Sequence, residues 1–254
     1  MAMPADMLIW GTGLAGLGAI VGSFVAALVV RWPQGRSVMR GRSMCDACGA
    51  PLRARDLVPL ASALLLHGRC RDCGTAIDPV HARIELAGLA IGAAAGLTAA
   101  SPVAIAGAVF GWMLLALAML DLRHWWLPDR LTATLALAGG TAGAAGVAPD
   151  LADRGIGGIA GFATLWMVAA GYRRLRGREG MGGGDPKLFG AIGLWLGWRM
   201  LPGVLMIASI VGLGWVAWQA VRGRSMAADD ALPFGVLLAV AAYPAWLAMI
   251  SWAP

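Results

Sequence analysis

Long apolar runs separated by short polar connections dominate the chain. A helix needs about 20 apolar residues to cross the roughly 30 Å of hydrocarbon in a bilayer, and most of the runs approach this length. We therefore expect eight membrane-spanning helices, although the run at 188–198 is short for a span. Because the connections between the runs are short, neighbouring helices should be antiparallel. The runs cover residues 8–30, 84–100, 103–120, 131–147, 155–172, 188–198, 203–221 and 232–252.

The composition agrees with this pattern. Of the 254 residues, 59% are hydrophobic and 13% are charged, whereas soluble domains average about 25% charged residues. The predicted fold class is therefore an all-α polytopic membrane protein with about eight transmembrane helices. Residues 31–83 are the exception, because they are polar and rich in arginine. They predict a small cytosolic insert between the first two spans.

The basic residues set the expected orientation, because Lys and Arg are retained on the cytoplasmic side of a membrane. With the N-terminus outside, all but two of the 20 basic residues, Arg154 and Arg199, fall in cytoplasmic connections. No basic residue precedes the first run, so we expect it to remain as a span and not to be a cleavable signal peptide. The net charge of +6 lies beside apolar spans, which favours the lipid bilayer as the partner and not nucleic acid.

All four cysteines lie in the polar insert, as two CxxC pairs formed by Cys45 with Cys48 and by Cys70 with Cys73. Two such pairs can supply the four thiolates of a tetrahedral zinc site, and their spacing resembles that of a zinc ribbon. A closed site with four sulfur ligands predicts a structural metal and not a catalytic one. Thiol redox chemistry, unbound cysteines, and His67 as a substitute ligand are the alternatives.

Glycines recur at every fourth position in two of the runs, a spacing that lets helix backbones approach closely in lipid. We expect them to pack helices against each other. The letters GTGLAG at 11–16 match a dinucleotide-binding fingerprint, but that fingerprint follows a strand, whereas this copy lies inside an apolar run. The spaced glycines are Gly18 and Gly22 in the first run and Gly88, Gly92 and Gly96 in the second.

Two aspartates stand where apolar runs meet polar connections: Asp121 ends the third run and Asp185 follows three glycines. Charged groups at a membrane border are costly, so they suggest function. Asp185 could instead cap a helix that begins at Pro186, and Asp129, which follows Pro128, could cap the next span. Asp121 has no such local role, because an anion is unfavourable at the C-terminal end of a helix.

Two facing carboxylates that share one proton can hydrolyse a peptide bond. One takes a proton from water while the other gives a proton to the carbonyl oxygen, and their mutual repulsion keeps the pair singly protonated. The glycines before Asp185 would let the backbone approach an extended substrate. The sequence therefore predicts an aspartyl protease at the membrane border.

Several blocks of the sequence resemble the type IV prepilin leader peptidases, which are membrane aspartyl proteases of the GxGD class. They are GSFVAALVVRWP, GRSMCDAC, DLVPLASALLLHGRCRDCG, LDLRHWWLPDRLT and GMGGGDPKLFGAIGLWLG. The resemblance implies that Asp121 and Asp185 are catalytic and that Asp129, Gly184 and Lys187 are accompanying motif positions. The chain departs from the usual pattern at Asp46, where a proline is common, and at 81–82, where Tyr-Pro commonly precedes the glutamate matched by Glu85.

The resemblance also implies the reaction. The family cleaves the basic leader of prepilins or pseudopilins after a glycine at the cytoplasmic face of the bacterial inner membrane. Many members then N-methylate the new terminus with S-adenosylmethionine, and the four cysteines accompany members with both activities. We expect a first span at 1–30, a cytosolic zinc-ribbon-like domain with the four cysteines at 31–83, and a protease core at 84–254. The alternatives are a transporter or proton relay that uses Asp121 and Asp185 as ion sites, and a non-catalytic scaffold.

Overall fold

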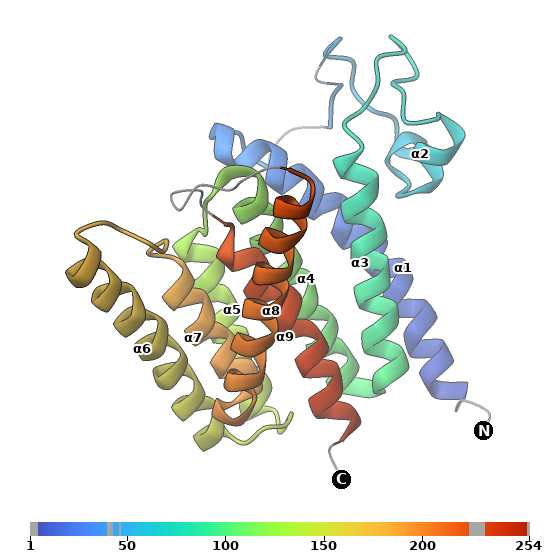
Figure 1. Cartoon of the computed structure of the whole chain (residues 1–254). Coiled ribbons are helices and arrows are strands. Elements are labelled where there is room, and N and C mark those ends of the chain that lie inside the picture. Colours follow the sequence, from blue (N-terminus) through green and yellow to red (C-terminus); the bar gives the residue numbers. More distant parts are fainter. Residues whose placement is uncertain (1–4, 40–42, 46, 224–231, 253–254) are drawn as a thin grey trace. The chain divides into compact units, whose positions relative to one another are not determined.

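The computed structural model describes residues 5–39, 43–45, 47–223 and 232–252. Each of the eight apolar runs forms one α-helix within this part of the chain (Figure 1). A further short helix, α2, lies in the polar insert, and the described residues form no strand beyond two isolated bridges. The helices are α1 Ala5–Arg31, α2 Ala61–Leu65, α3 Val80–Thr98, α4 Ser101–His124, α5 Asp129–Ala144, α6 Leu151–Arg176, α7 Asp185–Leu196, α8 Leu201–Val221 and α9 Phe234–Ser251.

Six of these helices are long and apolar enough to cross a membrane within the described residues: α1, α3, α4, α6, α8 and α9. This establishes a multi-pass, all-helical membrane protein. The helices α5 and α7 have 16 and 12 residues. At 1.5 Å per residue, α7 rises only about 18 Å, so the expected number of eight spans is not confirmed. Gly197, with a φ of 70°, ends α7.

The chain divides into two compact units, Met1–Ala116 and Leu117–Pro254, and the division falls within α4. In the first unit, the spaced glycines bring the backbones of α1 and α3 into direct contact. A Cβ atom at Gly18 would collide with the carbonyl oxygen of Gly88, and one at Gly22 would lie 2.7 Å from the Cα of Glu85. The predicted packing role of these glycines is confirmed.

In the second unit, glycines likewise bring the backbones of α6 and α7 into direct contact. A Cβ atom at Gly193 of α7 would collide with the carbonyl oxygen of Gly157 of α6, and one at Gly161 would lie 2.7 Å from the carbonyl oxygen of Phe189. The indole of Trp195 donates to the carbonyl oxygen of Leu135 at 2.8 Å, which joins α7 to α5. The short helix α7 is therefore held by its neighbours on two sides.

One arginine fixes the C-terminal end of α7. Arg154, which the sequence suggested to be a loop residue outside the membrane, lies in the first turn of α6 and is only 1% exposed. Its guanidinium donates to the carbonyl oxygen of Leu194 in α7 at 2.7 Å and to that of Gly139 in α5 at 2.9 Å. Its other acceptors are the carbonyl oxygens of Val147, Ala148 and Pro149 in the α5–α6 connection.

Candidate functional site

Asp121 lies in the last turn of α4, with its side chain directed at the beginning of α9. Its Oδ2 accepts a hydrogen bond from the backbone N–H of Val236 at 3.0 Å, although the two residues are 115 positions apart. The residue is only 6% exposed. The first N–H groups of a helix have no partner within the helix and carry partial positive charge. The cost of this anion at the end of α4 is therefore offset by a tertiary partner that the sequence does not reveal.

Asp185 is the first residue of α7, and it is also 6% exposed. Its backbone N–H donates to the carbonyl oxygen of Gly182 at 3.2 Å, which folds the glycine loop back over it. A Cβ atom at Gly182 would lie 3.2 Å from Asp185 Oδ2. Pro186 occupies the first turn, and the residue at the cap position of this helix is Gly184, which offers no side-chain hydrogen bond. The capping alternative for Asp185 is not formed here.

The loop between α4 and α5 brings the two aspartates into one site through Leu127. A Cβ atom at Gly184, directly before Asp185, would lie 2.7 Å from Leu127 Cβ. A Cβ atom at Gly235, beside Asp121, would lie 3.1 Å from Leu127 Cδ1. The ends of three helices, α4, α7 and α9, thus meet around one leucine.

The two carboxyls interact. Asp185 precedes the apolar run of α7 and lies outside the membrane-spanning segments. Burial, together with the nearby carboxyl of Asp121, raises the pKa of Asp185 to about 7. Two like charges that face each other away from water cannot both remain ionised at neutral pH. The arrangement favours one proton on the pair, with Asp185 as its carrier.

Asp129 and Lys187 form an ion pair beside this site. The Lys187 ammonium donates to Asp129 Oδ1 at 2.7 Å and joins the beginnings of α5 and α7. The helix α5 begins at Asp129 after Pro128, with no side-chain hydrogen bond to its terminus. The capping role considered for Asp129 is therefore not formed. The side chains of Asp129 and Lys187 are 70% and 48% exposed, so the pair orients the two helix ends more than it stabilises them.

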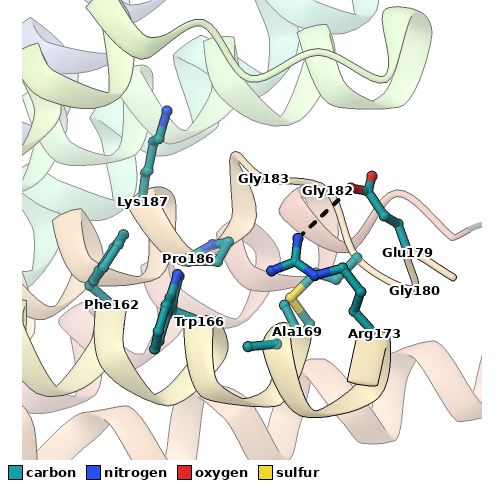
Figure 2. A pocket seen from close by; sticks show the side chains of 12 residues that line it. Phe162, Trp166, Ala169, Arg173, Glu179, Gly180, Gly182, Gly183, Pro186 and Lys187 are labelled. Atoms are coloured by element: carbon teal, nitrogen blue, oxygen red, sulfur yellow. Dashed lines mark ion pairs between the residues drawn. The ribbon is translucent and has the colours of Figure 1, made fainter. Parts of the chain in front are cut away.

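A pocket opens on the other side of the glycine loop (Figure 2), with a volume of about 360 Å³. One wall is the aromatic pair Phe162 and Trp166 of α6, and Pro186 also lines it. Arg173 and Glu179 approach within 3.9 Å at the far end. Because Gly182 lines the pocket and contacts Asp185, the pocket adjoins the candidate dyad.

The four cysteines meet at one point of the insert. The Sγ atoms all lie within 4.8 Å of one another, and those of Cys45 and Cys73 are 3.8 Å apart. Zn–S bonds of about 2.3 Å in a tetrahedron give S–S distances of about 3.8 Å. The geometry fits zinc. Cys70 is buried and the other three are at least partly accessible, and His67 is not part of this cluster among the described residues.

Each CxxC pair forms the same tight knuckle. The N–H of Gly49 donates to the carbonyl oxygen of Cys45, and that of Gly74 donates to the carbonyl oxygen of Cys70, both at 2.9 Å. Both glycines have a φ of 70°, a conformation that favours glycine. Isolated bridges close the two turns, joining Met44 to Pro51 and Arg69 to Ala76. Asp46 lies outside the described residues.

Two acidic side chains brace the insert. Arg71 donates to Asp56 Oδ1 through Nε and Nη2, at 2.9 and 2.7 Å, and this guanidinium lowers the pKa of the Asp56 carboxyl. Glu85 of α3, 7% exposed, accepts from the N–H of Leu60 at 2.8 Å. Leu60 has a φ of 60°, which is strained for a residue with a side chain. Glu85 therefore ties the insert to α3.

Comparisons with known proteins agree with these features. Residues 108–217 match the type IV leader peptidase family, and residues 17–99 match the bacterial Peptidase A24 N-terminal domain. A protein named prepilin leader peptidase/N-methyltransferase from Burkholderia pseudomallei strain K96243 is 44% identical over 203 residues, which cover 78% of this chain and 64% of that protein. The chain thus spans less than two thirds of that relative.

Two further relatives with the same name are matched over most of their length. The protein from Dickeya chrysanthemi is 36% identical over 259 residues, covering 91% of this chain and 90% of the relative. The protein from Neisseria gonorrhoeae is 31% identical over 263 residues, covering 93% and 92%. No solved structure matches the chain.

The contribution of α9 to this site is not apparent from the sequence. Gly235 and Val236, which contact Asp121, were not identified as site residues, and neither was Leu127. A signal was available, since Pro233 and Gly235 begin the last apolar run and a proline often stands at the start of a helix. Nothing in the sequence connects that helix start to Asp121 across the intervening helices.

Proposed function

Because the chain belongs to the type IV leader peptidase family, we propose that it cleaves the basic leader from prepilins or pseudopilins. The observation that carries the proposal is the pair of buried, interacting carboxyls of Asp121 and Asp185 at adjoining helix ends. The names of the relatives support the substrate class. The reaction is hydrolysis of the peptide bond that follows the last leader residue, a glycine.

In the proposed mechanism, Asp121 is the base and Asp185 the acid. Asp121, whose Oδ2 accepts from the Val236 N–H, takes a proton from water. The water oxygen bonds to the scissile carbonyl carbon while Asp185 gives its proton to the carbonyl oxygen. The C–N bond then breaks, the proton on Asp121 passes to the leaving nitrogen, and the carbonyl proton returns to Asp185.

The pocket in Figure 2 supports a place for the substrate beside the dyad. Its wall of Phe162 and Trp166 suits an apolar substrate segment, and the glycines of the loop leave room for an extended backbone. We propose that residues flanking the scissile bond lie along Trp166 with the peptide directed over Gly182. Lys187 pairs with Asp129 next to this path and orients the first turn of α7, which carries Asp185.

The second proposed activity is methylation of the new N-terminus, with S-adenosylmethionine as the methyl donor. It rests on the names of the relatives and on the cysteine cluster, which the family resemblance associates with members that have both activities. In the insert, Cys45, Cys48, Cys70 and Cys73 would hold a structural zinc ion that fixes the two knuckles.

The proposed location is the bacterial inner membrane, with the active site facing the cytoplasm. The excess of basic residues in the connections on one side supports this orientation. In the expected topology, the cytoplasmic side contains the insert, the α4–α5 connection and the loop before Asp185. The basic leader of a substrate is then within reach of the dyad before export.

The test is the conversion of a co-expressed prepilin in membranes by variants of the full chain. Asp121→Asn and Asp185→Asn should each abolish conversion, because neither asparagine can exchange protons with water or the carbonyl. Asp6→Asn, at an exposed position at the start of α1, is the matched control and should convert the substrate normally. The mass of the product N-terminus reports cleavage and methylation together. Full conversion by a stably inserted Asp185→Asn variant would end the proposal.

A further inference from the structure

The first turn of α9 lies directly against the Asp121 carboxylate. Val236 donates its backbone N–H to Asp121 Oδ2 at 3.0 Å, and the same N–H also reaches the carbonyl oxygen of Pro233 at 3.2 Å. Gly235 is buried between Asp121 and Leu127. The orientation of this carboxylate therefore depends on backbone from a helix far along the chain.

The second observation is that no side chain fits at position 235 without moving its neighbours. A Cβ atom there would lie 2.8 Å from Asp121 Oδ2, 3.1 Å from its Cγ and 3.1 Å from Leu127 Cδ1. Contacts below 3.0 Å require something to move, and the atom that must move first is the carboxylate oxygen that accepts from Val236. Gly235 has an ordinary helical conformation, so the need for glycine here comes from close approach and not from backbone φ.

We propose that Gly235 is a positioning residue for the protease: its missing side chain lets the α9 N-terminus approach Asp121 and hold that carboxylate toward Asp185. The inference rests on the proposed function, because it assigns a task to α9 in the same site. The N–H donor and the partial positive charge of the helix start hold the Asp121 carboxylate in one rotamer. Leu127, in contact with Gly235 and adjacent to Gly184, sets the spacing between the two acids.

The experiment measures kcat and KM of the full-length enzyme in detergent with a purified prepilin. Gly235→Ala should lower kcat by roughly 10- to 100-fold with KM unchanged, as expected when a reacting group is displaced by a fraction of an ångström to about 1 Å. Val236→Pro removes the N–H donor at a position in the first helical turn, where proline is tolerated, and should also lower kcat. Neither Gly235 nor Val236 lies on the proposed substrate path, so neither substitution should change KM.

Gly212→Ala is the matched control. This helical glycine of α8 also faces α9, and a Cβ atom there would lie 2.8 Å from Leu237 Cδ1, the end of a flexible side chain. The variant disturbs the packing of α9 without touching Asp121 and should keep normal kcat. Equal losses in Gly212→Ala and Gly235→Ala would overturn the inference, because general disturbance of α9 would then explain both.

Failure of the inference and failure of the proposed function give different results. If Gly235→Ala or Val236→Pro cleaves at the normal rate while Asp121→Asn is inactive, the positioning role is refuted and the protease stands. If Asp121→Asn itself cleaves normally, the proposed function falls and the inference falls with it. A loss of kcat in both α9 variants, with normal Gly212→Ala, supports the role of Gly235.

Discussion

Arg154 offers a quantitative test of how the second unit holds α7. Arg154 donates to five carbonyl oxygens, and four of them have no backbone N–H donor from a regular helix. Three belong to the α5–α6 connection, at Val147, Ala148 and Pro149, and the fourth is that of Leu194, two residues before the end of α7. Arg154→Met keeps much of the side-chain volume but removes every donor. The carbonyl oxygens stay at least partly buried, so they lose their partners without becoming fully hydrated.

The cost follows from this count of carbonyls. Leaving a buried acceptor without a donor costs about 1 kcal/mol or more, so four of them predict a loss of about 4 kcal/mol, within the range for breaking a buried charged network. For a chain of this size, each kcal/mol lowers Tm by roughly 2–4 °C, which gives a decrease of roughly 8–16 °C. Arg154→Lys keeps three donors, and its Tm should fall between those of Arg154→Met and the wild type.

The assay is thermal unfolding of the detergent-solubilised protein. Arg199→Met is the matched control, because the Arg199 side chain is 73% exposed and pairs with Asp153 at 3.5 Å. Exposed pairs of this kind contribute less than about 1 kcal/mol, so this variant should unfold near the wild-type temperature. Equal unfolding temperatures for correctly inserted Arg154→Met and Arg199→Met would show that the buried hydrogen bonds of Arg154 do not hold α7.

Three further predictions concern the site and the insert. Cleavage should decline as the pH rises through about 7, because burial and the Asp121 carboxyl raise the pKa of Asp185 to about 7. The proposed acid loses its proton above that pH, so a rate that stays constant to about pH 9 would contradict this assignment. Trp166→Ala should raise KM for prepilin with kcat little changed, whereas Trp215→Ala, at a similarly exposed tryptophan, should alter neither. Cys45→Ser should lose the bound zinc measured by metal analysis of the purified protein, and Ser43→Ala should retain it, because only the former removes a thiolate ligand.

The helices were largely predictable, because a run of apolar residues in lipid has few alternatives to a helix. Every expected run contains a helix, and the spaced glycines Gly18, Gly22 and Gly88 pack α1 against α3 as expected. The CxxC spacing also carried enough information, since each pair forms a tight knuckle from residues that are close in sequence. The four thiols converge as predicted.

The long-range polar contacts were not predictable from the sequence. By sequence, Arg154 is a charged residue beside a short connection, and only the fold brings Leu194, 40 positions away, within reach of its guanidinium. The contact of Asp121 with Val236 is of the same kind. Hydrophobic patterns report which residues face an apolar environment, but they do not report which helix ends meet.

The shortness of α7 connects these two contacts to the proposed chemistry. A helix that rises about 18 Å cannot bring both of its ends to the surfaces of a hydrocarbon layer of about 30 Å. Polar groups at a helix end that lacks water must find partners in the protein, and Arg154 supplies one to Leu194 near the C-terminal end of α7. With that end fixed and with Gly157 and Gly193 in backbone contact along its length, the position of Asp185 at the other end is determined by the helix itself. These contacts, and not a match between helix length and bilayer thickness, therefore fix α7 along its axis.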